Sequence, residues 1–160
     1  EQIIDKDISR IMSLKDGGQK MSKSDLSEYS RISLLDESDE IIKKIKKAKT
    51  ADTVMPEKIE QILKLSEVNN LLNIYAGFSG IEKEKLIAQY KGQNFSNFKS
   101  DLSDILVEQM KPITAEIKKL MQDKGYLIEI LLEGQNKANE VAQKTINDVY
   151  DIVGFLRNET

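Results

Sequence analysis

Cysteine and histidine are absent from the 160 residues, and proline occurs only at Pro56 and Pro112. Without cysteine the chain has no disulfide, no thiolate nucleophile and no zinc site built on thiolates, which fits a reducing compartment. Without histidine it lacks the side chain that most often serves as a general base near neutral pH. Any chemistry of this chain therefore depends on lysine, serine, carboxylate or backbone groups.

Long apolar runs and a strong excess of one charge are also missing. No run approaches the roughly 20 apolar residues of a membrane span, so no membrane partner is expected. The net charge of −3 argues against a protein that binds nucleic acid over its whole surface, although a local basic face remains possible. Because Ile3, Ile4 and Ile8 precede any turn signal and the first residue is Glu1, we expect Glu1 to be an edge inside a longer protein.

The scarcity of proline and the spacing of apolar residues predict helices from Asp36 onward. We therefore predict an all-α fold, a helical bundle, over residues 36–160. The first expected helix is capped by Ser38 and ends near Lys49, and the second starts at Ser66 and closes at Gly77 and Gly80. A capping box of Ser79 and Glu82 opens the third. The fourth has an apolar stripe from Phe98 to Met121 and is kinked or broken at Pro112, and the fifth follows Gly125.

The N-terminal part reads differently. Residues 8–14 form a short apolar-rich run that ends at Lys15, Asp16, Gly17 and Gly18. This pattern is typical of a buried strand or edge segment that leads into a flexible loop.

That loop carries the residues best suited to chemistry, because Lys20 and Lys23 place two ammonium groups near Ser22 and Ser24. A loop of this kind can surround a polyphosphate with backbone N–H groups, hydroxyls and two point charges. When a carboxylate attacks the α-phosphate of ATP, negative charge builds on the departing pyrophosphate, and lysines stabilise it without any proton transfer. Taken alone, a pentapeptide with two lysines is more often an ordinary solvated loop.

The pentapeptide and its flanks resemble the class I aminoacyl-tRNA synthetases, and within them the tryptophanyl branch. Lys20-Met21-Ser22-Lys23-Ser24 is similar to the second signature of that class. Further similar segments follow in the order that the branch shows: Arg10-Ile11-Met12-Ser13-Leu14, Asp16, Asp25, Leu34-Leu35-Asp36, Ile42-Lys43-Lys44-Ile45, Ala48-Lys49-Thr50, residues 67–75, Phe98-Lys99-Ser100-Asp101-Leu102, Lys111-Pro112-Ile113 and residues 149–155.

The resemblance implies a cytoplasmic homodimer that activates L-tryptophan with ATP to tryptophanyl-adenylate and transfers it to the tryptophan tRNA. Residues 1–35 are then the C-terminal edge of a Rossmann-like catalytic domain with its lysine loop, and residues 36–160 a helical anticodon-binding domain. Lys20 and Lys23 are the implied catalytic residues, with Lys23 as the leading candidate for the pyrophosphate charge. The implied ATP-binding residues are Ile11, Lys20, Met21, Ser22, Lys23 and Ser24.

Two further expectations follow from the resemblance. Mg²⁺ would arrive with ATP, because no spacing of side chains suggests a metal site held by the protein. The first signature of the family contains histidines, which this chain lacks, so we expect the isolated chain to be inactive.

Other interpretations stay open at this point. One is a fragment of a tyrosyl-tRNA synthetase, against which the segment 67–75 argues. Another is a helical interaction or scaffold module whose lysine loop matches by accident. A run of five lysines is either a solvated helix face or a stripe that contacts tRNA phosphates: Lys43, Lys44, Lys46, Lys47 and Lys49.

Overall fold

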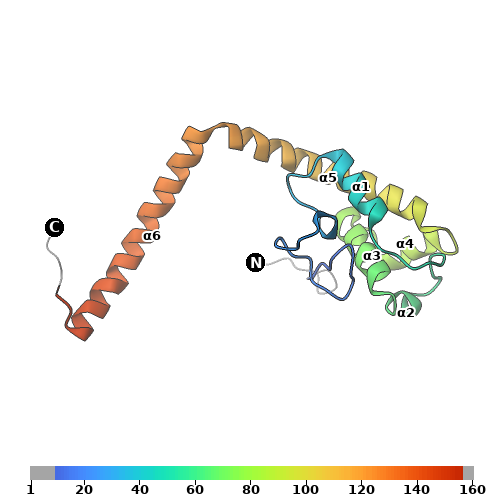
Figure 1. Ribbon diagram of the computed structural model, residues 1–160, viewed down its shortest axis with the longest axis horizontal. Helices are drawn as coiled ribbons and strands as arrows, with labels where there is room; N and C mark the ends of the chain where they lie inside the picture. Colours follow the sequence, from blue (N-terminus) through green and yellow to red (C-terminus); the bar gives the residue numbers. More distant parts are fainter. Residues whose placement is uncertain (1–9, 157–160) are drawn as a thin grey trace. The chain divides into compact units, whose positions relative to one another are not determined.

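The computed structural model describes residues 10–156, so Ile3, Ile4 and Ile8 lie outside the described residues. Its helices are η1 (Glu28–Ser30), α1 (Ser38–Lys47), α2 (Ile59–Ile62), α3 (Ser66–Ser79), α4 (Lys83–Tyr90), α5 (Phe95–Gln122) and α6 (Lys124–Val153) (Figure 1). Within the described residues no strand forms, and one isolated antiparallel bridge joins Met12 to Lys20. The prediction of an all-α fold is confirmed.

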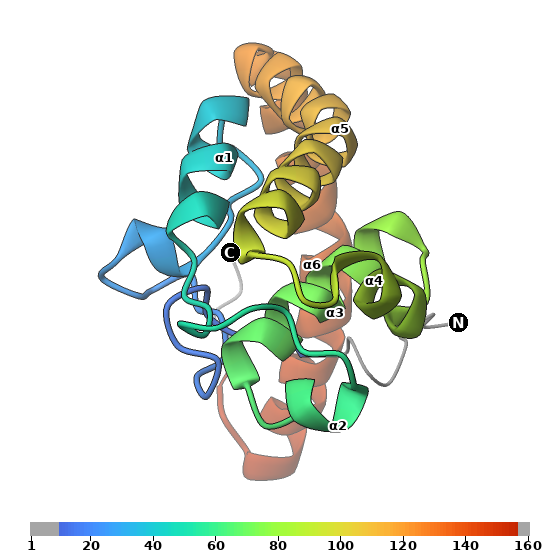
Figure 2. The same cartoon turned by 90° about the vertical axis from the view of Figure 1, so that its right-hand side faces the viewer.

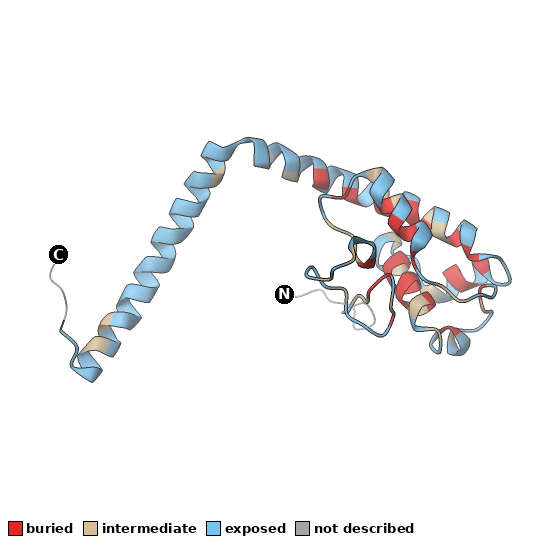
Figure 3. Cartoon of the chain, viewed as in Figure 1, coloured by how far each residue is buried: buried red, intermediate tan, exposed pale blue. Residues whose placement is uncertain are grey.

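The chain divides into two compact units, Glu1–Ala115 and Glu116–Thr160, and α5 contributes to both. The first unit holds the core, which Figure 3 shows as buried positions gathered on α1, α3, α4 and the first turns of α5. In the second unit, no residue of α6 is buried. No helix in the described part of the chain combines the length and the apolarity that crossing a membrane requires.

Helix starts differ from the predicted ones by a few residues. Ser38 was expected to cap α1, but Glu37 is the N-cap, and its N–H donates to the Glu40 carboxylate at 2.9 Å. Similarly, α4 is capped at Glu82, while Ser79 is the last residue of α3. A helix boundary depends on which of several neighbouring polar side chains reaches the free N–H groups first, and the local pattern does not decide this.

Helix ends follow the predicted breakers in part. α3 passes through Gly77 and ends at Ser79, with Gly80 as its C-cap, where the left-handed backbone (φ 69°) suits a residue without a side chain. We predicted a kink or a break at Pro112; α5 continues through this proline to Gln122, so the break does not occur. The missing N–H of one proline does not end a helix whose buried face continues on both sides, here at Met110 and Thr114.

Three aromatic rings from α3, α4 and α5 form the centre of the core. The ring centroids of Tyr75, Tyr90 and Phe98 lie 5.3–6.1 Å apart. The Tyr90 hydroxyl donates to Asp101 at 2.5 Å and pairs with the Tyr75 hydroxyl at 3.1 Å. Burial raises the pKa of Tyr90 well above its usual value, so its hydroxyl keeps the proton that it donates. This network fixes α3 and α4 side by side and joins them to α5 (Figure 2).

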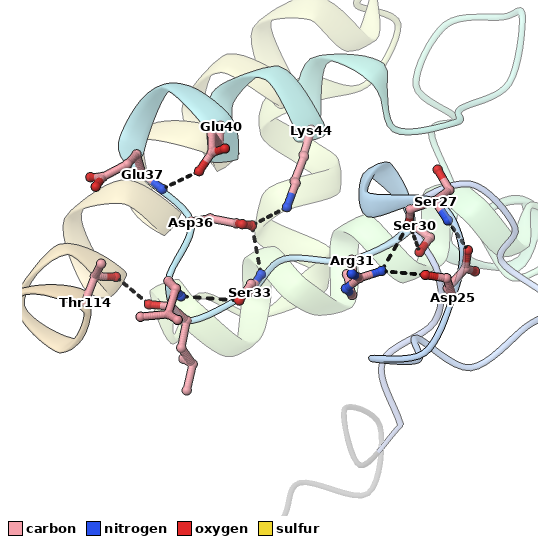
Figure 4. Close-up of polar contacts among 12 residues, drawn as sticks. Asp25, Ser27, Ser30, Arg31, Ser33, Asp36, Glu37, Glu40, Lys44 and Thr114 are labelled. Carbon is pink, nitrogen blue, oxygen red and sulfur yellow. Dashed lines mark hydrogen bonds and ion pairs between the residues drawn. The ribbon is translucent and has the colours of Figure 1, made fainter. Parts of the chain in front are cut away.

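A second polar network fixes the segment before α1 (Figure 4). The Asp36 carboxylate accepts a hydrogen bond from the Ser33 N–H at 2.8 Å and binds the Lys44 ammonium at 2.5 Å. Both charged side chains are buried, with only 9% and 10% of their surface exposed. Thr114 on α5 donates to the Leu34 carbonyl at 2.8 Å. Residues 33–36 are therefore tied to α1 and α5, and Lys44 does not belong to the solvated face of α1.

The buried pair gives a stability prediction. Lys44→Met leaves the Asp36 carboxylate buried without its counter-charge, so we expect the free energy of unfolding to fall by about 3 kcal/mol. Urea denaturation of the chain measures this change. Lys43→Met is the matched control, because Lys43 is exposed on the same helix and its loss should change stability by less than about 0.5 kcal/mol. Equal effects of the two variants would contradict the assignment.

Candidate ATP-binding loop

The lysine loop, residues 20–24, lies on the second arm of a small hairpin. The Met21 N–H donates to the Ile11 carbonyl at 3.1 Å, and the Ser13 N–H donates to the Gln19 carbonyl at 2.8 Å. Between these bonds, Met12 and Lys20 form the isolated bridge. The apolar run was predicted to be a buried strand or an edge segment. Its described part is the first arm of this hairpin, and no sheet lies beside it among the described residues.

The turn of the hairpin packs against the start of α3. Asp16 closes the turn, because its carboxylate accepts from the Gly18 N–H at 2.9 Å and its carbonyl accepts from the Gln19 N–H at 3.1 Å. Gly17 is buried, and a Cβ atom there would lie 2.4 Å from the carbonyl carbon of Ser66. Only glycine allows the turn to approach the backbone of α3 so closely.

The first arm is bound to α3 by a side-chain amide. The Asn70 Oδ1 accepts from the Met12 N–H at 2.8 Å, and the Asn70 Nδ2 donates to the Met12 carbonyl at 2.8 Å. Leu14 is buried in the core with 2% of its surface exposed. Its N–H donates to Ser30 at 2.9 Å, and its carbonyl accepts from the Lys49 N–H at 2.8 Å.

An ion pair adds a link between this region and α3. The Lys49 ammonium lies 2.8 Å from the Glu67 carboxylate. This hydrogen-bonded pair raises the pKa of Lys49 and lowers the pKa of Glu67. Because the lysine side chain is mostly exposed, the pair orients Lys49 more than it stabilises the fold.

The loop itself is open. Lys20, Ser22, Lys23 and Ser24 are exposed, and Met21 is half-buried and packs against the core. Ser22 and Ser24 bond each other, with 3.0 Å between their hydroxyl oxygens. In the part of the chain that the structure describes, neither loop lysine has an ion-pair partner. The two positive charges are thus available to an anion from solution.

The chain leaves the loop through a second fixed point. The Asp25 carboxylate accepts from the Ser27 N–H at 2.8 Å, and the Arg31 guanidinium donates to the Asp25 carbonyl at 2.9 Å (Figure 4). An open cationic tip between two anchored ends can bind phosphates without disturbing the core. Among the described residues, no group of three or more acidic side chains is arranged to hold a metal.

The structure therefore places the backbones of Ile11 and of the five loop residues on one hairpin. Sequence reasoning missed Asn70 and the packing of Gly17 on Ser66, both of which position the loop. The sequence pattern that could have pointed to Asn70 is an amide side chain inside the apolar stripe of α3. In the structure this residue is buried, with 3% of its surface exposed. Such a buried amide needs partners, but the stripe does not say which.

Comparison with known proteins identifies the family. The family model described as tRNA synthetases class I (W and Y) matches residues 3–111. This chain belongs to that family. The membership confirms the resemblance stated on the loop and its flanks, and it does not favour an accidental match in a scaffold module.

The relatives favour the tryptophanyl branch. The chain is 43% identical to a tryptophan–tRNA ligase from Rhizobium meliloti over 157 residues, which is 98% of this chain and 44% of the relative. It is 44% identical to a tryptophan–tRNA ligase from Rickettsia felis over 156 residues, 98% of this chain and 47% of the relative. The chain thus spans a little less than half the length of these ligases, and the tyrosyl alternative is not favoured.

Solved structures agree at the level of the fold. The tryptophanyl-tRNA synthetase from Mycoplasma pneumoniae matches with a TM-score of 0.72 and 24% identity, over 96% of this chain and 47% of that one. The enzyme from Campylobacter jejuni, complexed with ADP and tryptophan, matches with a TM-score of 0.69 and 23% identity, over 91% of this chain and 44% of that one.

The glycine turn gives a prediction for this class I synthetase chain. Gly17→Ala forces the hairpin away from α3, and we expect a loss of about 1–3 kcal/mol in the free energy of unfolding. Gly18→Ala is the control, because a Cβ there would meet only the movable Asp16 side chain at 3.2 Å. Thermal or urea unfolding measures both variants. A Gly17 variant as stable as the Gly18 variant would show that the close approach to Ser66 is absent.

Proposed function

We propose that this chain is the C-terminal part of a tryptophan–tRNA ligase, which activates L-tryptophan with ATP to tryptophanyl-adenylate and transfers it to the tryptophan tRNA. The observation that carries the proposal is an open loop with two exposed lysines that have no ion-pair partner among the described residues, in a chain that matches tryptophan–tRNA ligases over 98% of its length. In this proposal residues 1–35 are the edge of the catalytic domain and residues 36–160 the anticodon-binding domain. The complete ligase would act in the cytoplasm as a homodimer.

The reaction needs positive charge more than it needs proton transfer. The tryptophan carboxylate attacks the α-phosphorus of ATP, the bond from that phosphorus to the bridging oxygen breaks, and pyrophosphate leaves with the bonding electrons. Lys20 and Lys23 stabilise the charge that develops on the pyrophosphate, with Lys23 in the leading role. Met21, Ser22 and Ser24 contribute backbone and hydroxyl groups to ATP, and Ile11 lies near the adenine. Mg²⁺ enters with ATP.

The exposed state of the loop fits this role. Within residues 10–156, Lys20 and Lys23 form no ion pair with a carboxylate that an incoming triphosphate would have to displace. Closure of the loop over ATP then brings both charges to the phosphates at the time of the reaction. The isolated chain is not expected to catalyse activation, because it lacks the histidine-containing signature of the family.

The loop gives a test of the proposal. In the complete ligase, Lys23→Ala should lower kcat for tryptophan-dependent exchange of pyrophosphate into ATP by about 10²–10³, the usual cost of removing one group that stabilises the transition state. Lys20→Ala should lower the rate in the same direction. Lys15→Ala, which removes an exposed lysine from the same hairpin, should retain the normal rate. Normal exchange in the Lys20/Lys23 double variant would overturn the proposal.

The exposed face of α1 is the proposed contact for tRNA phosphates. Lys43, Lys46 and Lys47 are exposed there, whereas Lys44 binds Asp36 and Lys49 binds Glu67. Lys47 also lies over the Tyr29 ring at 4.2 Å. Of the five lysines, we therefore propose only these three exposed ones as contacts for tRNA phosphates.

Salt dependence tests this face. Replacing Lys43, Lys46 and Lys47 by glutamine in the complete ligase should weaken binding of the tryptophan tRNA and reduce the slope of log K against log salt by roughly 2, since each lost phosphate contact accounts for about 0.7–0.9. The charge-matched control replaces three exposed lysines elsewhere in the first unit, Lys58, Lys64 and Lys91. The same slope in both variants would place the tRNA contact elsewhere.

A further inference from the structure

Asn70 is one of the buried polar residues on α3, and both polar atoms of its side chain form hydrogen bonds with the backbone of one other residue, Met12. Its oxygen accepts from the Met12 N–H at 2.8 Å and its nitrogen donates to the Met12 carbonyl at 2.8 Å, 58 positions away in the sequence. The nitrogen also lies 3.5 Å from the Ser13 carbonyl. The amide thus pairs with the backbone of Met12 in the way that a neighbouring strand would.

No other side chain of similar size repeats this pairing. Aspartate offers only acceptors when ionised, so it would accept from the Met12 N–H but repel the Met12 carbonyl. Alanine would leave both buried backbone groups without partners. Asn70 is therefore matched to the N–H and C=O of one residue in the first arm of the hairpin.

Met12 in turn forms the bridge to Lys20, and the neighbouring Ile11 carbonyl accepts from the Met21 N–H. A continuous path of hydrogen bonds and bridge pairing thus leads from α3 through the first arm to the first two residues of the lysine loop. We propose that Asn70 is a positioning residue for ATP: it fixes the arm from which Ile11 and Lys20 are presented to the nucleotide. This inference rests on the proposed function of the loop.

The neighbouring residue supplies a matched control. Asn69 lies on the same helix, and its buried side-chain oxygen has no hydrogen-bond partner within residues 10–156. Asn69→Ala removes a similar amide without breaking a bond to the hairpin. The packing of α3 on the core rests on Val68, Leu71 and Leu72, which neither substitution changes.

In the complete ligase, Asn70→Asp and Asn70→Ala should raise KM for ATP about tenfold, as expected for the loss of one or two hydrogen bonds that orient the site. KM for tryptophan should stay within about twofold of the unchanged enzyme, because the arm serves the nucleotide. Asn69→Ala should leave both constants unchanged. A merely structural role would lower the unfolding temperature without this split between the two substrates.

The outcomes distinguish a failure of the proposed function from a failure of the positioning role of Asn70. If the unchanged ligase shows no tryptophan-dependent exchange, the proposed function fails. If it shows normal exchange and the Asn70 variants keep a normal KM for ATP, or raise both KM values equally, the positioning role is overturned.

A second measurement uses the 160-residue chain and needs no activity. Trypsin cuts after Lys20 and Lys23, and the rate reports how often the hairpin opens. Asn70→Ala should be cut there about tenfold faster than Asn69→Ala, with circular dichroism showing that both variants keep their helices. If Asn70→Ala does not fold, Asn70→Asp replaces it. Equal cleavage rates would contradict the inferred link between α3 and the loop.

Discussion

The structure of the site depends on one constraint: the backbone of residues 11–14 is largely buried, has no sheet beside it in the part of the chain that the structure describes, and must still form its hydrogen bonds. Each bond is supplied by a different part of the chain. The Asn70 side chain bonds the backbone of Met12, and the second arm of the hairpin bonds the backbones of Ile11 and Ser13. The backbones of Ser30 and Lys49 bond the backbone of Leu14. Four separate segments therefore converge on one short arm, and the position of the lysine loop is fixed by the helices rather than by a sheet.

The tip of the hairpin has the opposite character. Past Met21, the side-chain hydroxyls of Ser22 and Ser24 bond each other, and the lysine charges are open to solvent. Fixed ends with a free tip are what a charge-bearing loop requires: the anchors limit where the ammonium groups can be, and the tip supplies the movement. On the far side, the Asp25 and Asp36 networks hold the chain between the loop and α1.

Much of this could be predicted from the sequence, and the failures have physical causes. The apolar spacing located α3 and α4 because their buried faces repeat at helical intervals, and the loop was found because its residues are contiguous. The N-cap positions Glu37 and Glu82 were missed because serine is the more usual N-cap residue, and Ser38 and Ser79 lie close by. Of the kink or break predicted at Pro112, the break did not occur, because packing of the α5 face outweighs one lost hydrogen bond.

Long-range partners are the part that a linear pattern cannot supply. Lys44 looks like any other member of its lysine run, and only the fold shows that Asp36 binds it in a buried position. Asn70 likewise looks like a polar interruption of an apolar stripe. In both cases a polar residue on a buried helix face was the detectable sign, because such groups are rarely buried without a partner. The identity of the partner depends on which segment the chain returns to that face.

The same reasoning shows which part of the first unit is able to move independently. Because the first arm bonds to α3 and to Lys49 at the end of α1, a displacement of these helices also displaces Met12 and Leu14. Residues 33–36 follow α1 and α5 through Lys44 and Thr114. Between these anchors, the side chains of Lys20, Ser22, Lys23 and Ser24 are exposed. We therefore expect motion against the core in the few residues that carry the charges.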